Sequence, residues 1–323
     1  MINNLWQAFC LDGTLEIIEV NQGFPLIKVN NAHATATISL YGGQLLTFKP
    51  HTQKEPIIWL SKKAIFSKNK AIRGGIPICW PWFGAFEQHA FLEQELEQEP
   101  VFDSNIDTNS LPAHGYARIS HWQIQATQVM PDGGTKIILS LPRDKIKPPY
   151  HLLARYYNCD LELTIIINQE LKLELKTINR GQSIIPISQA LHSYFTVSDI
   201  HNVEISGLEQ SIYIDKLNAG KSSKQSSVLK FTAETDRVYL DSQQAVLLSD
   251  PGFERGIEVS KTDSLSTIIW NPWQEKTAQM NDMGETAWLN MVCIEPANVL
   301  HNQSSLSPGQ SLKLSCQIHV DDA

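Results

Sequence analysis

The clearest pattern along the chain is a strict alternation of apolar and polar residues in the segment 171–178, LKLELKTI. Its leucines occupy every second position, and lysines and a glutamate lie between them. Successive side chains of a β-strand point to opposite faces, so this period predicts a strand with one buried and one solvated face. The segment 311–320, SLKLSCQIHV, alternates in the same way and predicts a second strand of this kind.

Strand-like segments also dominate the rest of the chain. The segments 35–40, 135–141 and 161–167 are rich in β-branched residues or alternate between apolar and polar positions, which is typical of strands. Between 161–167 and 171–178 there is room only for a tight turn. These two segments therefore predict a β-hairpin.

Helical patterns are scarce. The segment 88–98, QHAFLEQELEQ, favours a short surface helix or an acidic loop insertion, and Pro100 would end the helix. The segments 103–110 and 219–227 are polar and predict exposed loops. We see neither a break in composition nor a repeat. The pattern therefore predicts one all-β domain over residues 1–323, built as a large antiparallel β-sandwich.

Composition and charge narrow the possible functions. Hydrophobic residues make up 42% of the 323 residues and charged residues 19%, which predicts a folded chain with a large core. The 26 lysines and arginines are outnumbered by 34 acidic residues, giving a net charge of −8. This balance argues against binding to a nucleic-acid backbone, which needs clustered basic charge. A few well-placed arginines could still hold a small anion.

The cysteine pattern and the N-terminal residues predict the cellular compartment. The cysteines contain no CxxC pair and favour reduced, buried thiols, whereas a catalytic cysteine would lack any supporting motif. The first residues show no signal peptide, and the most apolar run, 163–168, is too short to span a bilayer. We therefore expect a cytoplasmic protein without a membrane partner. The five cysteines are Cys10, Cys79, Cys159, Cys293 and Cys316.

Two segments combine arginine with glycine, proline and aromatic residues. In 73–84, RGGIPICWPWFG, Arg73 could clamp an anion, although an aromatic core turn with a solvated arginine is an equal alternative. In 111–118, LPAHGYAR, His114 alone is typical of a structural hydrogen bond, and Arg118 alone of a surface charge. The pair gains functional meaning if the first arginine converges on the same place.

Two further segments carry groups suited to proton transfer. In 189–195, QALHSYF, His192 reads by default as a satisfied core residue, but an imidazole is also a natural proton donor and acceptor near neutral pH. In 291–296, MVCIEP, Glu295 ends an apolar run, so it is paired, functional or a solvated strand end. Two more segments look like loops that could contact a sugar, namely 236–239 and 270–273.

Several common catalytic motifs are missing from the sequence. It contains no GxGxxG after a strand, no Walker A motif, no HExxH and no GxSxG. No close histidine pair with a downstream carboxylate predicts a metal site. Acid–base chemistry without a metal or an organic cofactor is the remaining expectation.

Taken together and in this order, RGGIPICWPWFG, LPAHGYAR, ALHSYF, WNPW and VCIEP resemble the motifs of the hexose-6-phosphate mutarotases, also called glucose-6-phosphate 1-epimerases. That family belongs to the galactose-mutarotase-like superfamily. The matching motifs run from residue 73 to residue 296, and the first of them is long and specific. The resemblance implies a β-sandwich that holds a hexose 6-phosphate, without metal or cofactor.

The resemblance also implies roles for individual residues. The catalytic histidine falls on His192 and the catalytic glutamate on Glu295, with Glu295 as base and His192 as acid. The phosphate-side arginines fall on Arg73 and Arg118, and an aspartate that contacts sugar hydroxyls falls on Asp236. Some members carry a substrate-contacting glutamine where this chain has Ala113, and His114 is the neighbouring candidate for substrate binding.

Other functions remain open at this point. The chain could be an epimerase of unphosphorylated aldoses, which the arginine-bearing motifs disfavour, or a sugar-binding domain without catalysis. A glycosidase would ordinarily need two carboxylates at the scissile bond, and the pair here is a histidine and a glutamate. We expect a monomer whose partner is a small-molecule hexose 6-phosphate.

Overall fold

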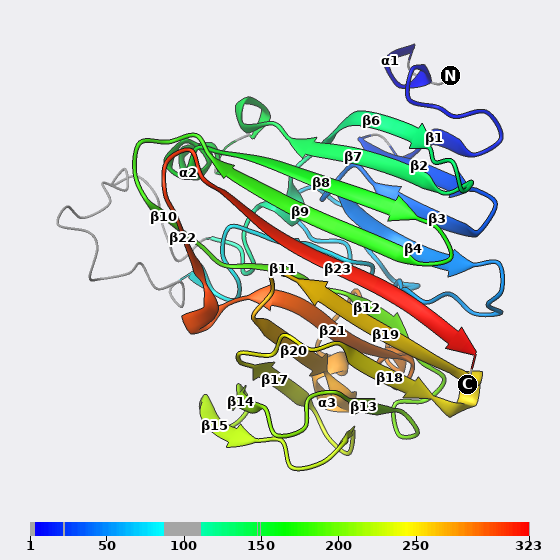
Figure 1. Cartoon of the computed structure of the whole chain (residues 1–323), viewed down its shortest axis with the longest axis vertical. Coiled ribbons are helices and arrows are strands. Elements are labelled where there is room, and N and C mark those ends of the chain that lie inside the picture. The colour runs from blue at the N-terminus through cyan, green and yellow to red at the C-terminus, as the bar shows by residue number, and fades with distance from the viewer. Residues whose placement is uncertain (1–3, 22, 87–110, 147, 149, 323) are drawn as a thin grey trace.

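The computed structural model of the chain is shown in Figure 1, and it describes residues 4–21, 23–86, 111–146, 148 and 150–322. The expected helix or acidic loop at 88–98 and the expected loop at 103–110 lie outside the described residues.

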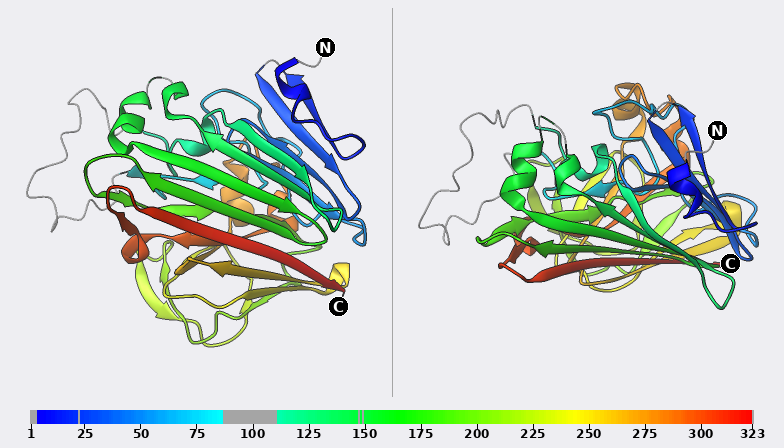
Figure 2. Two further views of the ribbon diagram at one scale, coloured as in Figure 1. Left: turned by 45° about the horizontal axis from the view of Figure 1, so that its top comes forward. Right: turned by 90° about the horizontal axis from the view of Figure 1, so that it is seen from above.

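The largest layer is a nine-stranded antiparallel sheet with the strand order β16-β13-β18-β19-β23-β9-β8-β7-β6. Its longest strands cross the front of Figure 1, and the sheet lies along one side of the molecule when it is seen from above in Figure 2. Its strands are β6 Gln123–Val129, β7 Thr135–Leu141, β8 Cys159–Ile167, β9 Leu171–Asn179, β13 Glu204–Ser206, β16 Leu229–Lys230, β18 Val246–Asp250, β19 Arg255–Thr262 and β23 Ser311–Asp322.

A second, eight-stranded sheet lies behind the first in Figure 1. Seven of its strands follow the order β15-β14-β17-β20-β21-β11-β5, and β12 pairs separately with β21. Its strands are β5 Ile78–Cys79, β11 Gln189–Leu191, β12 Tyr194–Thr196, β14 Ile212–Asp215, β15 Lys221–Lys224, β17 Thr235–Tyr239, β20 Ser266–Asn271 and β21 Met291–Asn298.

Smaller elements complete the described part of the fold. A four-stranded sheet comprises β1 Leu15–Asn21, β2 Phe24–Asn30, β3 Ala34–Ser39 and β4 Gln44–Pro50, and a two-stranded sheet comprises β10 Ile185–Ile187 and β22 Ser304–Leu306. The α-helices are α1 Asn4–Gln7, α2 His151–Tyr157 and α3 Trp273–Ala278. The 3₁₀-helices with assigned bounds are η3 Ala117–Ile119, η4 Arg143–Lys145, η5 Pro251–Phe253, η6 Ala287–Asn290 and η7 Leu300–Asn302.

The core forms where the alternating strands turn their apolar faces inward. The three leucines of β9 at positions 171, 173 and 175 are fully buried, as the alternation predicts. Between the two large sheets, the indole N–H of Trp80 donates a hydrogen bond of 3.0 Å to Thr177 Oγ1 in β9. One hydrophobic cluster extends from Leu15 in β1 to Ile318 in β23. This continuity supports our proposal that the chain is one domain.

The structure confirms the all-β prediction and each of the five predicted strands. Strand β3 lies at 34–39, β7 coincides with 135–141, and β8 and β9 form the expected hairpin by pairing antiparallel up to Ile167 and Leu171. Strand β23 extends the predicted 311–320 to residue 322. The buried faces of these strands are regular enough to be read from the order of residue types alone.

Three predictions of loops were wrong. The polar segment 219–227 contains β15, which is an exposed edge strand held by its backbone pairing to β14, so residue type gave no signal. The segment 236–239 lies in β17, and 270–273 contains the end of β20 and the start of α3. Helix α2 was not expected either, because its seven residues are too few to show a helical period.

In the part of the chain that the structure describes, no helix is both long enough and apolar enough to cross a membrane.

Two glycines provide a matched test of how tightly the core segments pack. Gly115 has a φ of +74°, and a Cβ there would lie 1.9 Å from the carbonyl oxygen of Trp80. Gly13 has a similar φ of +67°, with nothing within 4 Å of its Cβ position. We expect Gly13→Ala to destabilise the fold by about 1 kcal/mol, and Gly115→Ala by at least about 3 kcal/mol because backbone must also move. Chemical denaturation measures both, and equal losses would contradict the tight approach of Gly115 to Trp80.

Candidate functional site

The site is centred on two strands that pair with the same partner. Strand β11 pairs with β21 through Gln189 and Ala190, and β12 pairs with β21 through residues 194–196. His192 lies in the interruption between β11 and β12, where its backbone N–H donates to Pro77 O at 3.1 Å. Glu295 lies on β21 opposite this interruption. The pairing of strands therefore brings together two residues that are far apart in the sequence.

The histidine and the glutamate face each other inside the molecule. Nε2 of His192 is 3.4 Å from Oε1 of Glu295, and the two residues are 8% and 1% exposed. Nδ1 of His192 and Oε2 of Glu295 are buried and have no hydrogen-bond partner among the described residues. Buried polar atoms are normally satisfied. These two open atoms therefore mark the place where a polar ligand would complete the hydrogen bonding.

Burial sets the proton affinities of this pair in opposite directions. Burial, and then the charge of Arg118, lowers the pKa of His192 to about 3. Burial, and then the nearby Asp236 carboxylate, raises the pKa of Glu295 well above its ordinary value. Desolvation disfavours the charged form of both groups. Burial therefore favours the neutral form of both groups, so that a proton shared by the pair is drawn toward the glutamate.

Arg73 is linked to the pair through Tyr194. Its Nε donates to Asp282 Oδ1 at 3.2 Å, and its Nη1 donates to the hydroxyl of Tyr194 at 3.2 Å. The ring of Tyr194 stacks on the imidazole of His192, with ring centroids 4.9 Å apart and an interplanar angle of 12°. The guanidinium group is thus held in place, and the same tyrosine holds the imidazole.

The segment with His114 and Arg118 forms a further wall of the site. Nη2 of Arg118 donates to the carbonyl oxygen of Ala113 at 2.8 Å, while its buried Nε has no partner in the part of the chain that the structure describes. The ring of His114 lies 5.8 Å from that of His192 and 4.5 Å from that of Phe83. Burial, and then Arg118, lowers the pKa of His114 well below its ordinary value. His114 is therefore neutral at the edge of the pair.

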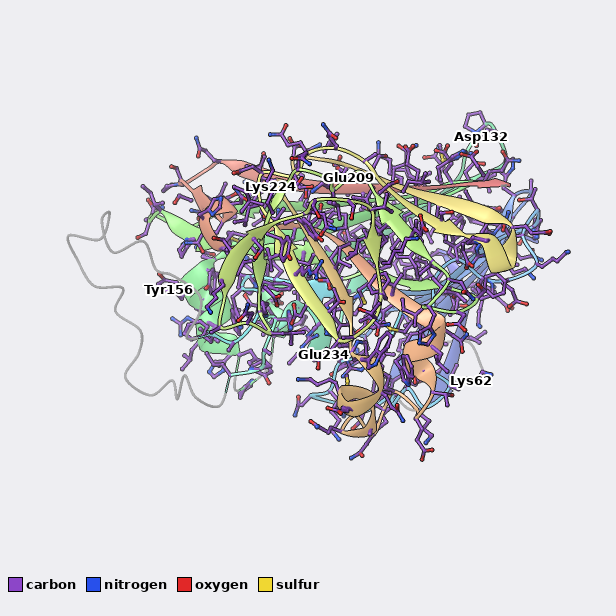
Figure 3. All side chains as sticks on the ribbon, turned by 90° about the horizontal axis from the view of Figure 1, so that it is seen from below. Lys62, Asp132, Tyr156, Glu209, Lys224 and Glu234 are labelled. Atoms are coloured by element: carbon purple, nitrogen blue, oxygen red, sulfur yellow. The ribbon has the colours of Figure 1, made fainter. Side chains whose placement is uncertain are left out.

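Asp236 reaches the same place from β17. Its carboxylate raises the pKa of Glu295, so the two acidic groups lie within electrostatic reach of each other. Its own pKa is raised by burial, against the opposing charge of Lys216, whose Nζ is 4.0 Å from Asp236 Oδ2. In Figure 3 the labelled Glu234, just before β17, lies below Asp132 and Glu209 and nearer the middle of the view.

Each residue that the sequence suggested for the site thus lies within contact or electrostatic reach of at least one other. Three contributors escaped the sequence analysis, namely Tyr194 as a support, Asp282 and Lys216. Tyr194 was visible only as a neighbour of His192. Asp282 is 209 positions from Arg73, and no local pattern marks it. Lys216 sits in an exposed hairpin of polar residues, which reads as ordinary surface.

The described residues contain one group that could hold a metal ion by geometry. One ligand atom each from His192, Cys293 and Glu295 lie within 4.8 Å of one another, and all three residues are buried. Burial raises the pKa of the Cys293 thiol well above its ordinary value, whereas a metal binds the thiolate. Acid–base chemistry without a metal stays a prediction.

Comparison with known proteins places the chain among sugar epimerases. The model of the family described as aldose 1-epimerase matches residues 25–319. A protein of Cenchrus ciliaris named "Putative glucose-6-phosphate 1-epimerase" is 31% identical over 301 residues, which cover 91% of this chain and 84% of that protein. A protein of the same name from Salmonella typhimurium is 31% identical over 306 residues and covers 91% of both chains.

Solved structures agree with the sequence comparison. A crystal structure from Salmonella typhimurium, described as "a putative mutarotase (YeaD)", superposes with a TM-score of 0.82 at 27% identity. The superposition covers 98% of this chain and 96% of that one. The fold is therefore that of the mutarotases over nearly the whole chain.

The burial of the cysteines predicts how the thiols react. Cys10 is half-buried and the other four cysteines are buried, and burial raises the pKa of Cys79, Cys159 and Cys316 to about 12. Since the thiolate is the reactive form, we expect a thiol reagent to modify Cys10 alone in the native protein. The reagent should reach the other four only after unfolding. Cys10→Ser serves as control and should leave the native protein unreactive; fast reaction of Cys293 would instead favour a nucleophilic cysteine beside His192.

Proposed function

The chain belongs to the aldose 1-epimerase family and is an isomerase that interconverts sugar anomers, and from this premise we propose that its substrates are hexose 6-phosphates. The observation that carries the proposal is the convergence of two arginines on a buried acid–base pair. Arg73 and Arg118 both act on the pKa of His192. The names of the relatives from Cenchrus ciliaris and Salmonella typhimurium point to the same substrate class.

The reaction needs one base and one acid at the same time. The base removes the proton of the C1 hydroxyl while the ring oxygen O5 gains a proton from the acid. The C1–O5 bond then breaks, and the resulting aldehyde rotates about C1–C2. Ring closure on the other face reverses both proton transfers, so that no atoms or charges are gained or lost. We assign these transfers to Glu295 and His192, each typically contributing about 10²–10⁴ in rate.

A single proton on the pair is enough for both roles. When His192 carries the proton, Glu295 is the base and His192 the acid, as the family motifs imply. When Glu295 carries the proton, the roles are reversed. Because the two groups approach to 3.4 Å, a small movement lets the proton pass between them. The same pair therefore serves ring opening and ring closure, and its apparent pKa values belong to the pair.

The arginines supply the charge that a phosphate ester requires. Such an ester carries roughly −1.5 to −2 charges near neutral pH, and the whole protein carries −8. The phosphate therefore needs a local cluster of positive charge. Guanidinium groups suit this task because they bind phosphate oxygens through two parallel hydrogen bonds. We assign the phosphate to Arg73 and Arg118. The buried Nε of Arg118 has no partner among the described residues and could donate to a phosphate oxygen. We assign the sugar hydroxyls to Asp236 and His114.

We further propose that the protein acts as a monomer in the cytoplasm. A net charge of −8 and a small-molecule substrate fit this proposal. Size-exclusion chromatography with light scattering measures the oligomeric state directly.

Exchange spectroscopy by NMR tests the substrate class, with glucose 6-phosphate as substrate and glucose and galactose as comparisons. We expect the protein to accelerate anomer exchange of the phosphorylated sugar far more than that of the free sugars. Arg118→Ala should lower kcat/KM for glucose 6-phosphate about tenfold to a hundredfold, since a hydrogen bond to a charged group is worth about 1.5–3 kcal/mol. The rates with glucose should fall less, because glucose has no phosphate for Arg118 to bind.

Arg155→Ala is the matched control for this variant, because Arg155 is exposed on α2. Equal acceleration of free and phosphorylated sugars by the wild type would contradict phosphate specificity. No acceleration of any sugar would favour a sugar-binding domain without catalysis.

Replacement of the glutamate tests the acid–base pair. Glu295→Gln keeps the shape of the side chain but removes its ability to exchange a proton. We expect kcat to fall by about 10²–10⁴, while binding of glucose 6-phosphate, measured by calorimetry, stays within a few fold of wild type. Glu234→Gln, on the rim before β17, is the control and should keep its rate. A Glu295→Gln variant with a normal kcat would remove this residue from the chemistry.

A further inference from the structure

Lys216 is held beside the site by both its backbone and its side chain. It follows β14, and its backbone N–H donates to the carbonyl oxygen of Asp236 at 3.0 Å. Its Nζ lies 4.0 Å from Asp236 Oδ2 and 5.8 Å from the centre of the Phe83 ring. That ring packs edge-on against His114. The ammonium group therefore sits between the carboxylate of β17 and the aromatic wall of the site.

We propose that Lys216 is a positioning residue of the epimerase reaction: its ammonium group orients the Asp236 carboxylate and supplies positive charge to the His192–Glu295 pair. The inference rests on the proposed function, because it takes this pair to be the acid and base. Neither the sequence motifs nor the names of the relatives assign Lys216 a role.

The charges that face the pair support this role. Asp236 on β17 opposes ionisation of Glu295, and Lys216 and Arg118 favour it. The same two cations, together with Arg73, disfavour a proton on His192. Lys216 and Arg118 are thus the cations that act on both members of the pair.

Substrate binding separates the roles of these two cations. In the proposed complex the phosphate dianion faces Arg118 and Arg73, so much of their positive charge is offset by the ligand. Lys216 Nζ lies 4.0 Å from Asp236 Oδ2, whereas Arg73 contacts Tyr194 and Arg118 contacts Ala113. The charge of Lys216 stays available to the pair while the sugar is bound. Without it, the aspartate and the glutamate would repel each other with one opposing cation fewer.

The groups around Asp236 also provide a matched control. Lys276 is an exposed residue in the last turn of α3, and its charge lowers the pKa of Asp236, as that of Lys216 does. It is not among the main groups that shift the pKa of Glu295 or of His192. Asp215, at the end of β14, opposes ionisation of Asp236. Lys276→Met therefore removes a positive charge near Asp236 but none of the main charges that shift the pKa values of His192 and Glu295.

The test measures the pH dependence of kcat for glucose 6-phosphate by NMR exchange, with the spontaneous rate subtracted. A cation favours loss of a proton, so its removal raises the pKa values of the pair. We expect Lys216→Met and Lys216→Gln to move the alkaline limb of kcat upward by about one pH unit, which corresponds to about a tenfold change in protonation. We also expect KM to rise through the loosened Asp236. Lys216→Arg should restore the wild-type profile, and Lys276→Met should leave the limb unmoved.

The outcomes separate this inference from the proposed function. If the wild type exchanges no sugar anomers, the proposed function fails and the inference falls with it. If the wild type is active and both Lys216 variants lower the rate with an unmoved profile, the inference alone is overturned. An upward shift that Lys276→Met reproduces would also overturn it, because the effect would then be a general loss of surface charge.

Discussion

The site depends on one feature of strand pairing, namely that β11 and β12 share the partner β21. His192 lies in the short interruption between them, opposite Glu295 in the register, and its Nε2 is 3.4 Å from Glu295 Oε1. Both residues are buried. The register is the same on both sides of the interruption, so position 192 lies directly opposite position 295. Directly opposite residues of antiparallel strands place their side chains on the same face, close together. The shared register is therefore what puts an imidazole and a carboxylate into one buried space.

Because the pair is buried, the surrounding charges affect its protonation strongly. A buried carboxylate resists ionisation and a buried imidazole resists protonation, so burial favours the neutral forms of both. The arginines, Lys216 and Asp236 adjust where a proton shared by the pair resides. Tyr194 connects Arg73 to His192, since it stacks on the imidazole and accepts a hydrogen bond from Arg73. The residues assigned to substrate binding thus also hold and tune the residues assigned to the chemistry.

The sequence alone predicted the architecture well because half-buried strands have a period that residue types reveal. Strands β7, β9 and β23 were readable from their alternation. Strand β15 was not, because both of its faces are exposed and polar, and its existence rests on backbone hydrogen bonds to β14. The local motifs likewise marked Arg73 and Glu295 as candidates. No local pattern could show that Asp282 would come to lie against Arg73 from across the chain.

The site residues missed by sequence analysis share a physical property. Asp282 and Lys216 act on other side chains, so their position relative to Arg73 and Asp236 determines what they do. A residue that contacts substrate must have a particular chemical type at a particular place. A residue that orients a neighbour needs only a suitable charge within a few ångströms of it, and many surface residues have that charge. The structure distinguishes the two cases because it gives the distance and the burial of each partner.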